Sequence, residues 1–162
     1  MPPDLVLRAE TPDDASAVET LYAAAFGPGR HARTAARIRE GAEPEPGVSF
    51  VADRRTLVIG AIRQTPILIG DAPALMLGPL AVAETAAKQG IGRALLTRSI
   101  AAARETDALS IILVGDEPFY GPSGFTVVPH GSLMMPGPVE RHRLLQLPLR
   151  MTLSGTVSAR ER

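Results

Sequence analysis

The chain has 162 residues, of which 45% are apolar, so we expect one domain with a substantial hydrophobic core. Its 17 Lys and Arg residues balance 17 Asp and Glu residues, and only 4% of its residues are aromatic. Without a basic field or many stacking rings, nucleic acid is a poor substrate and an anionic membrane a poor partner. The absence of Cys excludes disulfides, thiolate metal sites and a thiol nucleophile, and we expect no metal.

Targeting signals are not evident in the sequence. Asp4 and Arg8 fall inside the stretch that would have to be apolar in a signal peptide. The longest mostly apolar run, Ala74 to Ala83, is too short to span a membrane and contains Gly78 and Pro79. These features favour a cytoplasmic protein.

The N-terminal part predicts a short strand followed by a helix. Leu5 to Leu7 are apolar, and Thr11-Pro12-Asp13-Asp14 supplies a capping Thr, a Pro at the first helical position and an acid at the third. The helix should end before Gly27-Pro28-Gly29, and a more polar helix is expected from about Thr34 to Glu40. One apolar stripe on the first helix comprises Val18, Leu21, Tyr22, Ala25 and Phe26.

Three consecutive strands are predicted next, at Val48 to Ala52, Leu57 to Ile69 and Leu75 to Val82. Turn signals at Asp53-Arg54-Arg55 and Gly70-Asp71 separate them. Connections this short join antiparallel neighbours.

After Val82 the pattern becomes helical, with an apolar face of Ile91, Leu95, Leu96, Ile100 and Ala103. Ala108 to Val114 then reads as a buried strand. A strand, helix and strand in succession leave the two strands parallel, so the sheet is expected to be mixed. Further strands are predicted at Phe125 to Val128 and Leu144 to Leu149, and residues 154–162 form a polar tail that we expect to be frayed, after a domain of residues 1–153.

The turn between the strand ending at Val82 and the next helix has the features of an anion site. Gly90 and Gly92 open the helix, where the first N–H groups lack partners within the helix and the macrodipole is positive. Both glycines would let a pyrophosphate approach the backbone, and Lys88 and Arg93 could add positive charge.

Two familiar nucleotide motifs do not fit this turn. The dinucleotide fingerprint needs Gly or Ala where the chain has Leu95, and a P-loop needs Gly-Lys-Ser/Thr, whereas Lys88 lies between Ala87 and Gln89. From spacing alone, an ordinary strand-to-helix turn with packing glycines remains an equal alternative.

Three segments in register resemble the GCN5-related N-acetyltransferase (GNAT) superfamily. They are L-G-P-L-A-V from Leu77, K-Q-G-I-G-R-A-L-L from Lys88, and V-G-D-E-P-F-Y-G-P-S-G-F from Val114. The sequence is most similar to bacterial predicted N-acetyltransferases of the YhbS type, with the resemblance strongest from Ser49 to Val128.

The resemblance implies a single α/β domain whose mixed, mostly antiparallel sheet is flanked by helices. Its parallel strands, residues 75–82 and 108–114, should splay apart, and acetyl-coenzyme A should lie in the opening. The strand that ends at Val82 would bind pantetheine through its main chain, and the amides from Lys88 to Arg93 would bind the pyrophosphate. The chain departs from the family at Ala87, where Gln or Arg is usual. The implied cofactor-binding residues are Leu80, Ala81, Val82, Ala87, Lys88, Gln89, Gly90, Ile91, Gly92 and Arg93.

The family usually protonates the leaving thiolate with a Tyr shortly before a Gly-Phe pair, and Tyr120 fits that position. A phenol is protonated at neutral pH, although Tyr120 could instead only pack at the rim of the domain. The base is less defined, because Ala74 to Ala83 has no ionisable side chain where many members carry Glu. Glu117, or its neighbour Asp116, is the candidate base, and either could equally cap the following turn.

Other polar residues have weaker claims. His31, His130 and His142 are expected to be exposed. The segment Phe26 to Arg33 and the loop Pro129 to Arg141 are candidate walls of the acceptor site, although Phe26 fits a core position equally well.

The sequence therefore favours an acetyl-coenzyme A-dependent N-acetyltransferase acting by direct attack on a primary amine in a ternary complex. Without Cys, an acetyl-cysteine intermediate is excluded. The acceptor is open among a small metabolite, an antibiotic-like amine, and a protein N-terminus or Lys, and a homodimer is compatible with base rates and the family. The rival hypothesis is a non-catalytic acyl-coenzyme A sensing module of the same fold. A plain structural domain is disfavoured by the three motifs.

Overall fold

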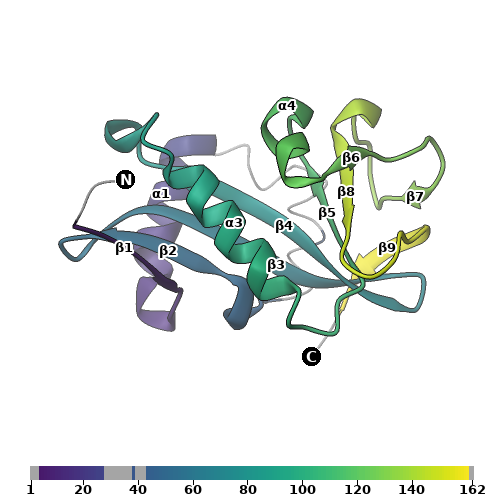
Figure 1. The fold of residues 1–162 in the computed structure, drawn as a ribbon, viewed down its shortest axis with the longest axis horizontal. Helices are drawn as coiled ribbons and strands as arrows, with labels where there is room; N and C mark the ends of the chain where they lie inside the picture. The colour runs from purple at the N-terminus through teal and green to yellow at the C-terminus, as the bar shows by residue number, and fades with distance from the viewer. Residues whose placement is uncertain (1–3, 28–37, 39–42, 161–162) are drawn as a thin grey trace.

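The computed structural model describes residues 4–27, 38 and 43–160. Its centre is a mixed sheet in the strand order β1-β2-β3-β4-β5-β8-β6 (Figure 1). All neighbours along this path are antiparallel except β4 and β5, which are parallel as predicted. The strands are β1 (Leu5–Ala9), β2 (Phe50–Arg54), β3 (Leu57–Ile69), β4 (Ala72–Val82), β5 (Ser110–Val114), β6 (Thr126–Val127), β7 (Leu133–Met134), β8 (Leu144–Pro148) and β9 (Gly155–Ala159).

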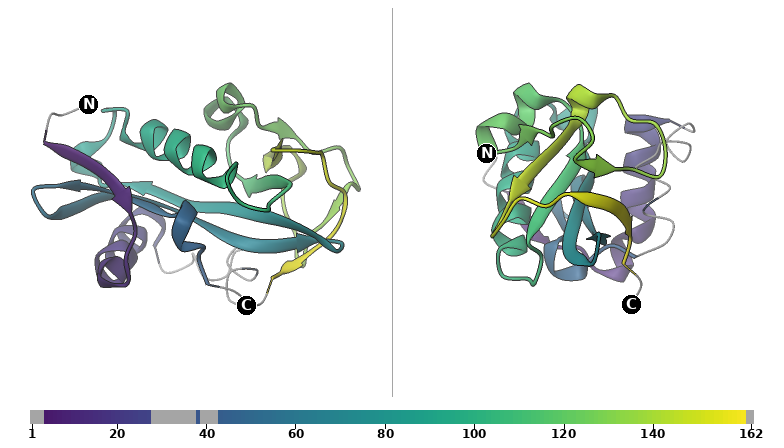
Figure 2. Two further views of the ribbon diagram at one scale, coloured as in Figure 1. Left: turned by 60° about the horizontal axis from the view of Figure 1, so that its bottom comes forward. Right: turned by 90° about the vertical axis from the view of Figure 1, so that its right-hand side faces the viewer.

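The two longer helices lie on opposite faces of the sheet (Figure 2). Helix α1 (Ala15–Phe26) buries Val18, Leu21 and Tyr22 of its predicted stripe against β3 and β4. Helix α3 (Ile91–Ala103) covers the other face and buries the whole predicted stripe. Among the residues described, no helix is long and apolar enough to cross a membrane.

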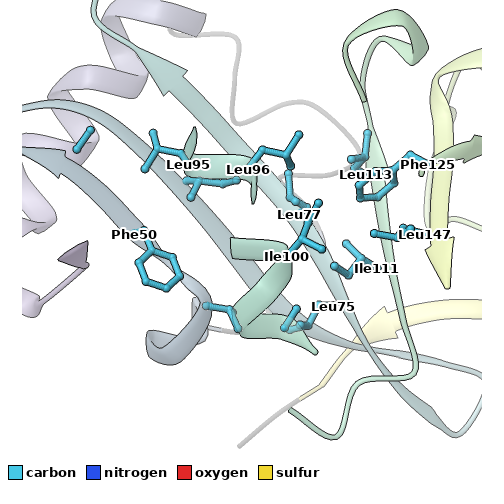
Figure 3. Close-up of a cluster of buried hydrophobic side chains, with 14 of the residues drawn as sticks. Phe50, Leu75, Leu77, Leu95, Leu96, Ile100, Ile111, Leu113, Phe125 and Leu147 are labelled. Carbon is cyan, nitrogen blue, oxygen red and sulfur yellow. The ribbon is translucent and has the colours of Figure 1, made fainter. Parts of the chain in front are cut away.

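The main core lies between α3 and the sheet. Figure 3 shows Leu95, Leu96 and Ile100 of α3 gathered with Leu77 and with side chains of β5. Phe125, just before β6, and Leu147 of β8 extend this core beyond β5. The unit β4–α3–β5 and the pair β6–β8 therefore share one apolar interior. Burial of this kind contributes about 1.5–3 kcal/mol for each large apolar side chain.

The helix start predicted at Thr11 is present with one difference. Residues Pro12–Asp14 form a single 3-10 turn before α1 begins at Ala15. The Thr11 N–H donates to Asp14 Oδ2 at 2.8 Å, and the Asp14 N–H donates to the Thr11 carbonyl at 2.9 Å. The capping residues are therefore those predicted, and they cap a tighter turn than an α-helix.

The first predicted hairpin turn is shifted by two residues. Strand β2 runs from Phe50 to Arg54, and Arg55 and Thr56 both have positive φ angles, 52° and 69°. Two left-handed residues between antiparallel strands match the right-handed twist of a hairpin, and turns that contain no Gly or Asn carry little sequence signal. The second turn, Gly70-Asp71, lies where it was predicted, between β3 and β4.

The polar C-terminal segment is ordered, contrary to prediction. Strand β9 pairs antiparallel with Ile67–Ile69 of β3 and parallel with β7. Val157 is buried, and its neighbours alternate toward solvent. The expectation of fraying was wrong because the long β3 extends beyond β2 and leaves an edge that β9 completes. The helix predicted at Thr34 to Glu40 lies outside the described residues, apart from the buried Ile38.

Candidate active site

The parallel strands β4 and β5 pair only at one end. Their ladder consists of Leu75 with Ile111 and Met76 with Ile112. Strand β4 then continues to Val82, where Leu80, Ala81 and Val82 pair with β3 on the opposite edge. The edge of β4 toward β5 is thus without a ladder beyond Met76 in the described structure, and it lies where the family resemblance implies pantetheine binding.

Strand β4 is also irregular at this point. The register against β3 shifts between the pairs Gln64–Leu77 and Ile62–Leu80, so Gly78 and Pro79 together lie opposite Arg63. The Tyr22 hydroxyl of α1 donates to the Pro79 carbonyl at 3.0 Å. A β-bulge re-aims the strand locally, and here α1 supports it from the other face of the sheet.

The turn that precedes α3 presents free backbone donors. The Ala94 N–H makes the first helical hydrogen bond, to the Gly90 carbonyl at 3.0 Å. In the described part of the chain, the amides of residues 88–93 donate no backbone hydrogen bond. Residues 87–90 are exposed. Amides without acceptors at the positive end of a helix dipole are groups to which an anion can bind, and they lie where the sequence analysis expects an anion site.

The two glycines of this turn have different roles. Gly90 has a φ of 80° with nothing within 4 Å of a built Cβ, so it is required by its left-handed backbone. A Cβ on Gly92 would lie 3.7 Å from Val82 and 3.8 Å from Phe119, which are ordinary contacts. Lys88 also has a positive φ, 62°, which is uncommon for a non-Gly residue and occurs at functional turns.

Charges around this turn differ partly from expectation. Lys88 is exposed, but the Arg93 guanidinium points to another segment, donating to the Phe119 carbonyl at 2.6 Å and to Ser123 Oγ at 3.2 Å. The sequence analysis missed Arg54, whose guanidinium donates to Gln89 Oε1 at 2.9 Å from the β2–β3 hairpin. Nothing in the spacing of Arg54 and Gln89 indicated this contact, because it depends on how α3 and the turn before it pack against β2.

Tyr120 lies in the short helix α4 (Glu117–Tyr120) that follows β5. Its ring packs edge-on against Phe119, with centroids 4.9 Å apart, and against Phe125 at 5.8 Å. Burial, helped by the charge of Asp116, raises the pKa of the Tyr120 phenol above its usual value. The phenol is therefore protonated throughout the neutral range.

The two acids beside Tyr120 are both exposed. The Glu117 carboxylate folds back on its own turn, where a Cβ on Gly121 would collide with it. Asp116 Oδ1 lies 3.5 Å from Arg143 Nε. Asp116 occupies the N-cap position of α4, where its carbonyl accepts hydrogen bonds from the amides of Phe119 and Tyr120, and its side chain makes no capping hydrogen bond.

The histidines and the expected walls of the acceptor site lie at the surface or pack in the core where the structure describes them. His130 is exposed, and the exposed His142 lies 3.2 Å from Glu140, as expected for solvated histidines. His31 and residues 28–33 of one expected acceptor wall lie outside the described residues. Phe26 is half-buried and packs on Tyr22, with ring centroids 6.2 Å apart. The loop Pro129 to Arg141 contains β7, and its Leu133 belongs to the same buried cluster as Ile112 of β5.

Comparisons with known proteins agree with this architecture. The model of the acetyltransferase (GNAT) family matches residues 15–120, more than half of the chain. None of the curated proteins is a match for the sequence.

Solved structures share the fold over almost the whole chain. The GNAT family N-acetyltransferase YhbS from Escherichia coli, in complex with CoA, has a TM-score of 0.81 at 24% identity, covering 97% of this chain and 90% of that one. A GNAT family acetyltransferase from Brucella melitensis, in complex with acetyl-CoA, has a TM-score of 0.70 at 23% identity, with 96% of each chain covered.

A third solved structure is more distant in sequence. Arabidopsis thaliana Naa50, in complex with the bisubstrate analogue CoA-Ac-MVNAL, has a TM-score of 0.62 at 14% identity, covering 89% of this chain and 98% of that one. With the family match over residues 15–120, the splayed β4–β5 pair and the glycine-rich start of α3, the chain belongs to the acetyltransferase (GNAT) family.

Proposed function

We propose that the protein transfers an acetyl group from acetyl-coenzyme A to a primary amine by direct attack in a ternary complex. The observation that carries the proposal is the combination of two backbone regions that, among the described residues, have no strand or helix partner on one side. One is the β4 edge beyond Met76, and the other is the run of amides at residues 88–93. An extended ligand with an anionic end matches a free strand edge that leads to a helix N-terminus.

The residues present fit coenzyme A in chemical type. Amides of Lys88 to Arg93 would hold the pyrophosphate, and the main chain of Leu80, Ala81 and Val82 would bind the pantetheine arm and polarise the thioester carbonyl. Bound acetyl-coenzyme A would supply the activated acetyl group. The chain has Ala87 where the family usually has Gln or Arg. Ala87 is exposed, and the free amides belong to residues 88–93, so this difference does not remove them.

In the proposed reaction the amine loses one proton and the leaving sulfur gains one. The amine nitrogen forms a bond to the acetyl carbon while the carbon–sulfur bond breaks. The Tyr120 phenol donates its proton to the departing sulfur, and its raised pKa keeps that proton available. Glu117, in the same turn, is the proposed acceptor of the proton that the amine loses. The chain has no Cys, so the acetyl group passes directly to the amine.

The proposed acceptor is a small-molecule amine or a protein amine. Two neighbours of the same fold are bound to peptide-like ligands: Arabidopsis Naa50 to a bisubstrate analogue, and the NatC complex to Gag peptide and CoA. The present chain has zero net charge, which favours neither acidic nor basic acceptors.

A thermal-shift titration with acetyl-coenzyme A, free coenzyme A, NAD and ATP tests the cofactor site first. At about a hundred times its Kd, a ligand stabilises the fold by about 2.7 kcal/mol. Stabilisation by the two coenzyme A forms alone supports the proposal, and no shift with either overturns it.

The second candidate function is a non-catalytic acyl-coenzyme A sensor. It is favoured by the lack of any ionisable side chain on β4 and by the position of Glu117 against its own turn. A panel of amines, followed by release of free thiol, separates the two functions. Turnover with any amine above the hydrolysis background excludes the sensor, and binding of coenzyme A without turnover across the panel favours it.

A further inference from the structure

The side chain of Arg93 connects two elements that are far apart in sequence. Its Nη2 donates to the Phe119 carbonyl at 2.6 Å, and its Nη1 donates to Ser123 Oγ at 3.2 Å. The guanidinium also lies over the Phe119 ring, 4.3 Å from the centroid. Three contacts from one half-buried side chain define its position.

The Phe119 carbonyl is a suitable partner for a cation. Helix α4 has only 4 residues, so most of its C-terminal carbonyls lack partners within the helix. A positive group at such an end is stabilising, and the planar guanidinium can donate to a carbonyl and a hydroxyl while stacking on a ring.

The contact lies between the two sides of the splayed strand pair. Arg93 belongs to the helix that follows β4, and Phe119 belongs to the helix that follows β5. Within the described part of the chain, the ladder between these strands consists only of Leu75 with Ile111 and Met76 with Ile112. Beyond that ladder, the Arg93 side chain therefore links the start of α3, which carries the amides, to α4, which carries Tyr120, through hydrogen bonds.

We propose that Arg93 is a positioning residue, whose guanidinium fixes α4, and with it Tyr120, against the start of α3. This inference rests on the proposed function, in which Tyr120 donates a proton to sulfur. It assigns the side chain of Arg93 to the Phe119 carbonyl, while only its backbone amide serves the pyrophosphate.

Kinetics of Arg93 variants test this assignment. Arg93→Gln should lower kcat at least about tenfold and leave the Kd for coenzyme A within about threefold, because the backbone amides are retained. Arg93→Lys, which keeps one donor but not the planar fork, should recover part of the loss. Arg98→Gln is the matched control, since Arg98 lies on the same helix with its guanidinium 5.2 Å from the Phe50 ring centroid, and it should leave both constants unchanged.

A different pattern overturns the proposal. A phosphate-binding guanidinium would raise the Kd for coenzyme A at least about tenfold in Arg93→Gln while kcat at saturation stays the same. Unchanged kcat and Kd would exclude both roles. The double variant Arg93→Gln/Tyr120→Phe should be no slower than Tyr120→Phe alone, and additive losses would contradict a role that acts through Tyr120.

A readout without turnover separates this inference from the proposed function. The chain has 2 Tyr residues, so selectively labelled protein gives two ring spin systems, which Tyr22→Phe assigns. An NOE between the Tyr120 ring and the Gly115 α-protons should be present in the native protein and in Arg98→Gln, and lost in Arg93→Gln. Its retention in a folded Arg93→Gln protein would overturn the positioning role of Arg93, whether or not any amine is acetylated.

Discussion

The Tyr120 ring lies directly on the backbone of Gly115. A Cβ built on Gly115 would be 2.6 Å from Cε2 of Tyr120, closer than real Cβ atoms approach other groups, and 3.2 Å from its Cδ2, which is a tight contact. Gly115 is the first residue after β5, and Tyr120 ends the helix that follows. The end of the buried strand is therefore the surface against which the proposed proton donor packs.

Gly115→Ala should displace the Tyr120 ring without affecting the amides at residues 88–93. We expect kcat to fall at least about tenfold while the Kd for coenzyme A, measured by calorimetry, stays within about threefold. Gly47→Ala is the control, because a Cβ there has nothing within 4 Å. Equal kcat values for the two variants would show that the position of Tyr120 does not matter.

Tyr120→Phe removes only the phenolic oxygen and keeps the edge-on packing against Phe119 and Phe125. Turnover should drop at least about tenfold with unchanged coenzyme A binding, because the thiolate then leaves without its proton donor. Since the pKa of Tyr120 is raised by burial, its ionisation should not reduce kcat of the native enzyme below about pH 10. A variant with the native rate would remove Tyr120 from the mechanism.

Gly90→Ala and Gly92→Ala form a matched pair on one turn. The first places a Cβ on a residue with φ of 80° and should cost about 1 kcal/mol of folding free energy. The second has helical backbone and ordinary contacts, so stability should stay equal or rise slightly.

Binding should separate this pair from a simple stability effect. Gly92→Ala is expected to weaken coenzyme A at least about tenfold in spite of its intact fold, because its methyl group occupies the approach to the helix amides. Urea denaturation and calorimetry on the same samples give both quantities. A stable Gly92→Ala protein with native affinity would mean that the glycine serves helix packing alone.

The ion pair between Arg8 and Asp14 predicts a pH-dependent stability. Two hydrogen bonds of 2.8 Å join the guanidinium to both carboxylate oxygens. They hold the pKa of Asp14 at about 2, below the unfolded value of 3.8. The stabilisation is therefore fully present above pH 3.8 and is lost as pH falls through about 2.

Asp14→Asn should lower the free energy of unfolding by about 1–2 kcal/mol at pH 7. The difference from the native protein should shrink between pH 4 and pH 2, when the native carboxylate also becomes neutral. Urea denaturation at several pH values measures it. A difference that does not change with pH would assign the effect to packing instead of charge.

Local patterns in the sequence were sufficient for most of the fold. The stripe from Ile91 to Ala103 and the turn at Gly70-Asp71 are local, so periodicity and backbone preference identified α3 and the second hairpin. The same holds for the amides before α3, because a helix start follows from the glycines that begin it.

Contacts between distant segments were decided only by the tertiary structure. Strand β9 looked like a polar tail because its pairing depends on the edge that β3 leaves open. Arg93 looked like a phosphate ligand because its sequence neighbours are the turn amides, but the parallel crossover brings Phe119 within reach of its side chain. The free amides before α3 were thus determined by the sequence alone, since a helix start needs only local geometry, whereas the open edge of β4 depends on where its ladder with β5 ends. The partners of the site's long charged side chains depend on which elements the sheet brings together.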